Sequence, residues 1–386
     1  MPLYRDAVRA TFRYNLFFMY YIKNDLHMRK IIFFALAFAA GTFTASAVEG
    51  ELPGRFTINA EGDTVHFSKG NLYYESGNAG GFYFSDKQYE SRPDGNSGNG
   101  IEYRSLFGFG TSGWANSGAV AYNPMDTIQG AANYLVGGSA ENGLTGDYAY
   151  ADWGIYNAIR NGGNMSGLWR TLSMDEWVYI LSQRENAQKL FTMGRIKYID
   201  DWDHQEYIYN GMILLPDNWV QPEGVSKVSL ITNYGWDLDY TPGDRLYNNS
   251  NLDLNTYILN TYSSEQWEVL EAAGAVFLPA EGYRKGSEIL DKGANGCYIS
   301  STPHGDGVCS LEFTSGNSSL YTPWYSRHLG YSVRLVTRPA GEKQGIENTP
   351  SPLWGESERG YKLLRNGQLL INRNGRTYNA TGAEVR

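Results

Sequence analysis

Short runs in which hydrophobic and polar residues alternate, separated by glycine-containing turns, recur along the chain. Residues 55–59 and 64–68 alternate in this way across a turn at residues 62–63, and residues 296–302 and 330–336 repeat the pattern later. Because successive side chains of a strand point to opposite faces of a sheet, the pattern predicts antiparallel strands. We expect the first two runs to form a hairpin and the last two to close an aromatic-rich antiparallel core.

Two other segments begin with the signals of helix N-termini. In the first, Ser173 stands before a hydrophobic run and Glu176 follows three residues later, which is the spacing of a capping box. Trp177, Ile180 and Leu181 recur at helical spacing and define the buried face. The sequence therefore predicts a helix that begins at Ser173.

The second helix start repeats this arrangement. Ser263 is the expected N-cap, Gln266 takes the reciprocal position, and Tyr262 and Trp267 are spaced to pack together across the first turn. Gly274 marks the expected end, because glycine adopts the left-handed conformation that often follows a helix.

Strand-like hydrophobic runs follow both helices, at residues 211–216 and 275–279. Strands of period two combined with two amphipathic helices predict an α+β fold, in which the helices pack on antiparallel sheets. We expect the core to rest on four large side chains: Trp177, Trp267, Phe277 and Val333.

Residues 77–118 are rich in glycine, serine, asparagine and aromatic residues, including Phe107, Phe109 and Trp114. This composition produces turns and shows no periodic hydrophobic face, so we predict long loops held by buried rings.

The composition changes after Val336. Residues 339–359 contain three prolines together with glycines and charged residues, and we interpret them as a linker. Residues 360–386 contain Asn-Gly pairs at Asn366 and Asn374 between strand-like runs, which predicts a small β-meander.

The start of the chain has the layout of a secretory signal. Met28, Arg29 and Lys30 form a positively charged start before a hydrophobic run at 31–40, and small residues lead to a cleavage site after Ala47. The run is shorter than the roughly 20 residues that span a bilayer, so no transmembrane anchor is expected in the mature chain. We interpret residues 1–47 as the signal region, with Met28 as an alternative start.

Composition and charge narrow the function further. The 386 residues include 45 glycines, 30 tyrosines and 10 tryptophans, which favours a β-rich globule over a helical bundle. The formal net charge of −9 argues against a nucleic-acid partner, because the chain lacks the basic surface that neutralises phosphates.

Two cysteines, Cys297 and Cys309, occupy odd positions of two strand-like runs and could face the same side. A hairpin symmetric about Gly305 would place Cys297 opposite Phe313 and separate the cysteines, whereas a bulge would bring them together. We predict a disulfide between them and leave the symmetric alternative open. A zinc site is less favoured, since only His304 lies near and a closed site needs four ligands.

Four segments together resemble a known group of domains. Residues 169–177 resemble the helix start shared by formylglycine-generating-enzyme-like domains and the Fibrobacter-type paralogous domain of Bacteroidetes surface proteins; residues 275–284, 298–302 and 330–336 extend the likeness over most of residues 55–337. The resemblance implies a C-type-lectin-like fold, whose function lies in its loops. We therefore expect one such domain over residues 48–338, with the two helices packed on antiparallel sheets.

The sequence departs from the functional patterns of that group. Formylglycine-generating enzymes use closely spaced reactive cysteines, which Cys297 and Cys309 do not match. The nearest string to a lectin calcium motif is residues 221–223, which lie far from the expected loop. The aspartates among residues 200–203 could supply oxygen ligands to calcium, but such a run is more typical of a solvated acidic turn. We therefore predict no catalytic residue, no cofactor and no metal.

The C-terminal meander resembles the sorting tail of type IX secretion, with residues 362–371 matching best. Such tails imply export across the outer membrane, followed by release or attachment to the cell surface. A simple β appendage is the alternative.

Ligand binding is best supported at residues 318–328, immediately before the closing strand. This segment combines flat rings with hydrogen-bond donors, which suit stacking on sugars or gripping a protein partner. The candidate ligand-binding residues are Tyr321, Trp324, Tyr325, Arg327 and His328. Packing of the loop is the alternative role for Trp324 and Tyr325, and residues 107–114 are the alternative location of the site.

Taken together, these features predict an exported binding protein without enzymatic activity, located at the outer membrane surface or outside the cell, that recognises a glycan or a protein ligand. Two alternatives remain: an enzyme of the formylglycine-generating type, and a structural fimbrial or surface component.

Overall fold

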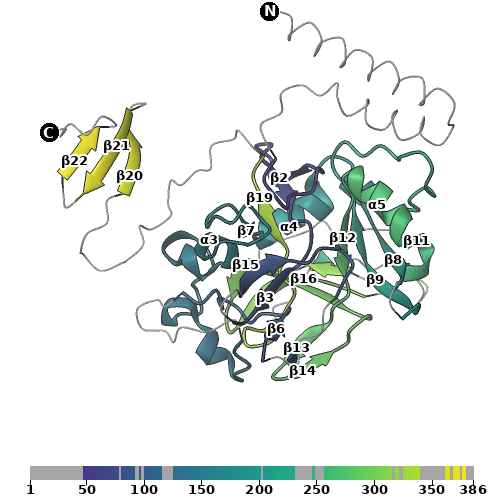
Figure 1. The fold of residues 1–386 in the computed structure, drawn as a ribbon, viewed down its shortest axis with the longest axis horizontal. Helices are drawn as coiled ribbons and strands as arrows, with labels where there is room; N and C mark the ends of the chain where they lie inside the picture. The colour runs from purple at the N-terminus through teal and green to yellow at the C-terminus, as the bar shows by residue number, and fades with distance from the viewer. Residues whose placement is uncertain are drawn as a thin grey trace, which may run out of the picture. The chain divides into compact units, whose positions relative to one another are not determined.

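The computed structural model divides the chain into two units, Met1–Ala47 and Val48–Arg386. Of the first unit only Ala47 is described, so the predicted signal lies outside the described residues. Strands predominate over a few helices, which confirms the α+β class (Figure 1). The structure describes residues 47–77, 80–91, 95–96, 100–114, 125–200, 203–230, 246–247, 256–314, 318–320 and 325–339, and the backbone of strands at 361–365, 368–373 and 376–379.

The predicted N-terminal hairpin is confirmed. Phe56 pairs with Val65, and the two strands join a sheet in the order β1-β2-β19-β7. Phe56 and Phe67 are fully buried, and their rings pack edge to face with 4.9 Å between the ring centres. The bounds are β1 Phe56–Thr57, β2 Thr64–Phe67, β7 Arg170–Thr171 and β19 Leu335–Thr337.

Part of the segment predicted as loops forms a second sheet, in the order β4-β3-β6-β5. Phe82 and Phe84 of β4 are buried while Gly81 and Tyr83 are half-buried, and this alternation is the signal that the glycine-rich composition hid. The expectation that buried rings hold this region is confirmed at Phe107 and Phe109. The bounds are β3 Leu72–Glu75, β4 Gly81–Phe84, β5 Gly95–Asn96 and β6 Glu102–Arg104.

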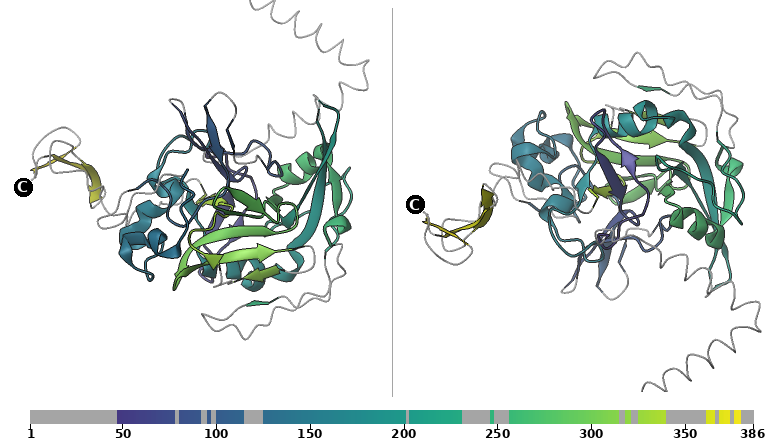
Figure 2. Two further views of the ribbon diagram at one scale, coloured as in Figure 1. Left: turned by 90° about the horizontal axis from the view of Figure 1, so that it is seen from below. Right: turned by 90° about the horizontal axis from the view of Figure 1, so that it is seen from above.

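The third sheet contains the longest hairpin of the described chain. Its order is β11-β8-β9-β12, and it confirms the strand-like runs that were expected after the helices. Phe277 of β12 lies opposite Ile213 of β9. Figures 1 and 2 show this hairpin at one side of the fold with α5 beside it. The bounds are β8 Phe191–Ile199, β9 Glu206–Leu214, β11 Thr261–Ser263 and β12 Val276–Pro279.

A fourth sheet has the order β10-β17-β16-β15, and β18 also pairs with β16. Its β15–β16 hairpin carries both cysteines. A small hairpin, β13–β14, stands apart from these sheets. The bounds are β10 Leu246–Tyr247, β13 Tyr283–Lys285, β14 Glu288–Leu290, β15 Gly296–His304, β16 Gly307–Phe313, β17 Ser318–Leu320 and β18 Tyr325–Ser326.

Residues 330–336, the closing segment, were expected to continue the antiparallel core as one strand beside residues 296–302, and they do not. Tyr331 bridges to Phe107, Ser332 makes a parallel bridge to Tyr298, and only Leu335–Thr337 forms a strand, β19. The segment therefore links several layers of the fold.

Both predicted helices and both capping boxes are confirmed. The Ser173 hydroxyl accepts from the Glu176 N–H while the Glu176 side chain accepts from the Ser173 N–H, and Ser263 and Gln266 repeat the exchange. Gly274 has φ of 98°, which ends the second helix as expected. The bounds are α3 Trp153–Tyr156, α4 Met174–Val178, α5 Ser264–Ala272, a π turn η4 Tyr179–Gln183, and 3-10 turns η1 Ala131–Tyr134, η2 Val136–Gly138, η3 Gly146–Ala151, η5 Ala187–Lys189 and η6 Thr256–Leu259.

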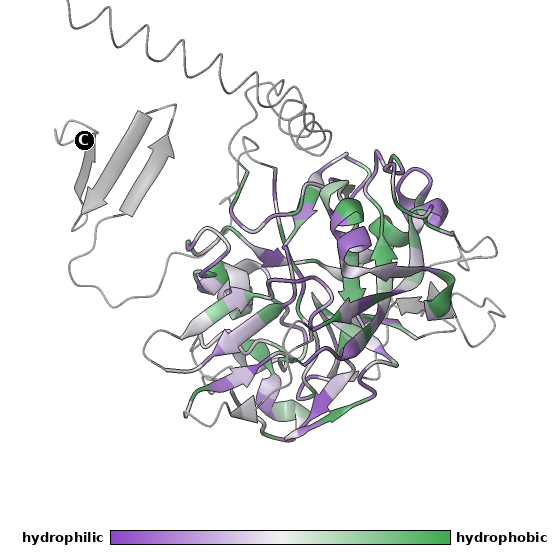
Figure 3. Cartoon of the chain, turned by 45° about the vertical axis from the view of Figure 1, so that its right-hand side comes forward, coloured by the Kyte–Doolittle hydropathy of each residue, from purple (hydrophilic) through white to green (hydrophobic). Residues whose placement is uncertain are grey.

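The predicted core residues are buried, and they divide among three hydrophobic clusters. Trp177 belongs to the first, Val333 to the second, and Trp267 and Phe277 to the third. Figure 3 shows hydrophobic and hydrophilic segments alternating along the strands that enclose these clusters.

The predicted disulfide is corrected. Cys297 and Cys309 are present as buried thiols, and Tyr298 lies opposite Leu311, so odd residues of β15 share a face with even residues of β16. The register shifts between Ile299 and Pro303, but a shift of two residues leaves this parity unchanged. Cys297 accordingly packs in the second cluster and Cys309 in the first, on opposite faces of the sheet.

The C-terminal residues form the expected three-stranded meander. Arg365 pairs with Gln368 and Arg373 pairs with Arg376, so each turn contains two residues. The bounds are β20 Tyr361–Arg365, β21 Gln368–Arg373 and β22 Arg376–Asn379. In the part of the chain that the structure describes, no helix has the length and hydrophobicity needed to cross a bilayer.

Candidate functional site

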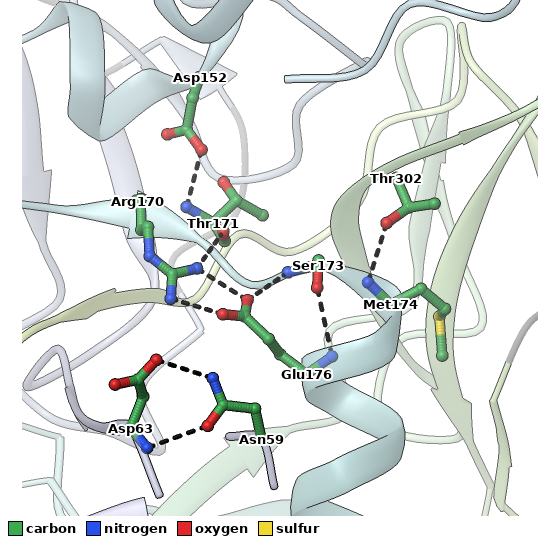
Figure 4. A network of polar contacts seen from close by, with 9 residues as sticks. All are labelled: Asn59, Asp63, Asp152, Arg170, Thr171, Ser173, Met174, Glu176 and Thr302. Atoms are coloured by element: carbon green, nitrogen blue, oxygen red, sulfur yellow. Dashed lines mark hydrogen bonds and ion pairs between the residues drawn. The ribbon is translucent and has the colours of Figure 1, made fainter. Parts of the chain in front are cut away.

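The segment that carries the family resemblance serves the packing of α4. The guanidinium of Arg170 donates to both carboxylate oxygens of Glu176, at 2.6 and 2.7 Å, and Glu176 also accepts from the Ser173 N–H at 2.8 Å (Figure 4). The Thr302 hydroxyl accepts from the Met174 N–H at 2.9 Å and ties the helix start to β15. These polar side chains bond to one another, which indicates a structural role.

Asp152 lies next to this network and is almost completely buried. Its carboxylate accepts from the Thr171 N–H at 2.7 Å and from the Gly154 N–H at 3.0 Å, which fixes β7 against the start of α3 (Figure 4). Burial raises the pKa of Asp152 to about 6, and the Thr171 N–H is the leading influence that lowers it.

A second buried carboxylate, Glu281, lies between the sheets with 2% of its surface exposed. It accepts from Asn71 at 2.6 Å, from the Ser332 hydroxyl at 2.8 Å and from the Tyr73 hydroxyl at 3.1 Å. Burial raises the pKa of Glu281, against the effect of these donors. All three donors are buried side chains of the fold itself, so we assign Glu281 to the core.

The structure describes the side chains of two of the five residues predicted to bind ligand. Tyr321 and Trp324 lie outside the described residues, and Tyr325 is described only as part of the β18 backbone. Arg327 and His328 lie just before the closing segment, and their side chains are described.

The role predicted for Arg327 is corrected. Its side chain is completely buried, its guanidinium donates to the carbonyl oxygens of Ala140 and Gly305, and it lies 4.8 Å from the centre of the Phe109 ring. A guanidinium held by internal carbonyls and a ring cannot reach a ligand outside. Arg327 thus holds the loop in place. Its burial could not be predicted from the sequence, because an arginine just before a strand is normally exposed.

His328 is half-buried, with its ring centre 6.5 Å from that of Tyr134. Burial, with a smaller contribution from Lys285, lowers the pKa of His328. The ring is therefore neutral near pH 7.

A cluster of half-buried aromatic side chains is formed by Trp114 together with tyrosines of η3 and α3. The Trp114 ring centre is 6.0 Å from that of Tyr150 and 6.4 Å from that of Tyr148, and Tyr150 is 6.1 Å from Tyr156. The rings meet at steep angles, so different ring faces are presented in different directions. We call Trp114, Tyr148, Tyr150 and Tyr156 the aromatic cluster.

Short hydrogen bonds hold the backbone beneath the aromatic cluster. The Ser112 hydroxyl donates to the Tyr150 carbonyl at 2.7 Å, and the Asn157 amide donates to the Ser112 carbonyl at 2.9 Å. Gly137 leaves room for the Tyr148 ring, because a Cβ on residue 137 would lie 2.1 Å from the nearest atom of that ring. These contacts position the rings before any ligand arrives, which limits the entropy lost on binding.

Residues 107–114 connect the aromatic cluster to the loop at residues 318–328 that was predicted to bind ligand. The Phe109 N–H donates to the Arg327 carbonyl at 2.9 Å, and Trp114 follows five residues later in the chain. The alternative location, residues 107–114, is thus adjacent to the predicted one. The sequence singled out Trp114 but could not pair it with tyrosines more than thirty residues away, because no local period connects them.

Comparison with known proteins gave no match: no family model, no curated protein and no solved structure is similar to the chain. Among the described residues, no group of three or more histidine, cysteine, aspartate or glutamate side chains is placed to hold a metal ion.

Proposed function

We propose that this chain is an exported, non-enzymatic binding protein that recognises a glycan or a protein ligand at the cell exterior. The observation that carries the proposal is the aromatic cluster, in which Trp114 and three tyrosines of η3 and α3 lie half-buried in fixed positions. Partly exposed rings with hydroxyl groups at their edges stack on sugar rings and also fill hot spots in protein interfaces.

The position of the thiols favours binding over the formylglycine-type alternative. That chemistry needs closely spaced reactive cysteines, whereas Cys297 and Cys309 are fully buried and belong to different hydrophobic clusters. A buried thiol in apolar surroundings is unreactive because its thiolate is not solvated.

The lectin-like fold and the surface location are part of the same proposal. Two capped helices together with antiparallel sheets support the fold. The three-stranded C-terminal sheet supports a sorting tail, and the signal-like N-terminus supports export.

An array of glycans and extracellular proteins, probed with the purified protein, tests the function. We expect capture of at least one ligand by the wild type, with clear loss in Trp114→Ala and Tyr150→Ala. Tyr179→Ala is the matched control, since Tyr179 is also a half-buried tyrosine but lies on the π turn after α4. Equal capture by all four proteins would overturn the assignment to the aromatic cluster.

A further inference from the structure

One face of the β8–β9 hairpin carries a row of tyrosines. Tyr198 of β8 lies opposite Tyr207 of β9, and Tyr209 lies on the same face, opposite Ile196. Tyr89, from the segment after β4, packs against this face. We call Tyr89, Tyr198, Tyr207 and Tyr209 the tyrosine row.

The tyrosine row continues a hydrophobic surface that α5 partly covers. Trp267 and Leu270 of α5 pack with Ile196 and Ile213 of the hairpin in the third cluster, and Tyr198 and Tyr209 lie partly buried at its margin. Exposure increases toward the hairpin tip, where Tyr207 is 42% exposed. The rings thus pass from the core to the solvent along one strand pair.

The rings converge on Tyr89. Its ring centre is 5.5 Å from that of Tyr209 and 6.2 Å from that of Tyr198, with an angle of 42° between the planes in both cases. Tyr89 is only 2% exposed, yet its hydroxyl has no hydrogen-bond partner among the described residues. Tyr89 therefore forms the buried base of the row, and the partly exposed rings of Tyr198, Tyr207 and Tyr209 present the surface that a ligand can reach.

Carboxylates surround the tyrosine row. Burial and then Glu268 raise the pKa of Tyr89, and burial and then Glu90 raise the pKa of Tyr209 to about 12. Glu271 and Asp200 add to the negative field at these rings, while Lys87 is paired with Glu268 at 3.0 Å. The α5 segment itself contains three glutamates and no basic residue.

We propose that the tyrosine row binds the cationic side chains of a basic peptide segment. Ring faces attract a guanidinium or ammonium group through their quadrupole, and nearby carboxylates add to that attraction. Arginine suits the surface better than lysine, because its planar group both stacks on rings and donates several hydrogen bonds.

This site is separate from the aromatic cluster, and its chemistry differs. In the three ribbon views the η1–α3 segment and the β8–β9 hairpin lie at opposite sides of the fold (Figures 1 and 2). Burial is the cause of the raised pKa of Tyr150 in the aromatic cluster, whereas carboxylates contribute at Tyr89 and Tyr209. The proposal therefore goes beyond the proposed function and does not depend on it.

Fluorescence anisotropy with labelled octa-arginine, octa-lysine and octa-glutamate peptides tests the site in the purified protein. We expect octa-arginine to bind most tightly and octa-glutamate not to bind. Tyr198→Leu keeps a hydrophobic side chain but removes the ring, and we expect it to weaken octa-arginine binding at least fivefold. Tyr207→Leu is a second variant, at an exposed position where the substitution carries little risk to folding, and we expect it to weaken octa-arginine binding as well.

Two controls separate this site from general attraction to an acidic protein. Ile208→Ala changes an exposed side chain on the opposite face of the same strand, and Trp114→Ala changes the aromatic cluster; both should bind octa-arginine as the wild type does. Absence of octa-arginine binding to the wild type, or equal binding by wild type, Tyr198→Leu and Tyr207→Leu, would overturn the proposal. Loss of glycan or protein capture in Trp114→Ala with retained peptide binding supports two separate sites.

Discussion

The guanidinium of Arg170 donates to both carboxylate oxygens of Glu176 and so joins β7 to the first turn of α4. The same carboxylate completes the capping box by accepting from the Ser173 N–H. One glutamate therefore satisfies an arginine and a helix terminus together, which explains why these residue types occur at this spacing.

Glu176→Ala should lower the free energy of unfolding by about 2 to 3 kcal/mol, because it leaves a partly buried guanidinium and a helix-start N–H without their acceptor. Urea unfolding measures the change. Glu206→Ala is the control: its ion pair with Lys197, at 3.0 Å, is more exposed, and its loss should cost less than about 1 kcal/mol. Equal costs at the two positions would contradict the structural role of Glu176.

Asp152 should give the fold a specific pH dependence. Its folded-state pKa, about 6, lies above the ordinary value of 3.8, so the folded state binds a proton more readily than the unfolded chain. The stability that this carboxyl contributes is fully present below pH 3.8 and is lost as the pH rises through about 6. The wild type should thus lose on the order of 3 kcal/mol relative to Asp152→Asn across this interval.

Urea unfolding of both proteins at half-unit steps from pH 4 to pH 7 checks the sign and the window. Parallel curves for the wild type and Asp152→Asn would show that this carboxyl does not titrate in the interval.

Local signals predicted a large part of the fold. Ser173 and Glu176, like Ser263 and Gln266, bond within one helical turn, so their capping boxes are readable from four consecutive residues. The meander turns after Arg365 and Arg373 are local in the same sense.

Non-local arrangements escaped prediction. Whether Cys297 and Cys309 share a face depends on the register of β15 against β16, and one residue of offset reverses it. Arg327 is buried because Ala140 and Gly305, distant in the sequence, bring their carbonyls to it. The aromatic cluster likewise assembles Trp114 with rings of a later segment.

The cysteines should react as two separate, protected thiols. In the native, unreduced protein, alkylation by iodoacetamide should be slow because both sulfurs are fully buried. After denaturation without reductant, mass spectrometry should detect two alkylated cysteines per chain. Resistance to alkylation in the denatured, unreduced protein would reveal a disulfide and contradict the opposed faces of β15 and β16.

Arg327→Ala should affect stability before it affects binding. The substitution removes the hydrogen bonds to Ala140 and Gly305 and the packing on Phe109, and we expect a loss on the order of 3 kcal/mol. Thermal and urea unfolding measure it. Arg195→Ala, which removes a half-buried arginine that donates to Thr261, should cost about 1 kcal/mol or less. Wild-type stability in Arg327→Ala, accompanied by weaker ligand capture, would restore Arg327 as a ligand contact.

The affinity of Trp114→Ala for a ligand captured by the wild type tests the central claim most directly. Truncating an aromatic anchor typically costs at least about 1 kcal/mol, so the dissociation constant should rise at least fivefold. Because Trp114 also packs against the second hydrophobic cluster, cooperative unfolding of the variant is the control that its fold is retained. Calorimetric titration of wild type, Trp114→Ala and Trp324→Ala gives the comparison. Unchanged affinity in Trp114→Ala together with lost affinity in Trp324→Ala would contradict the account and return the binding site to residues 318–328.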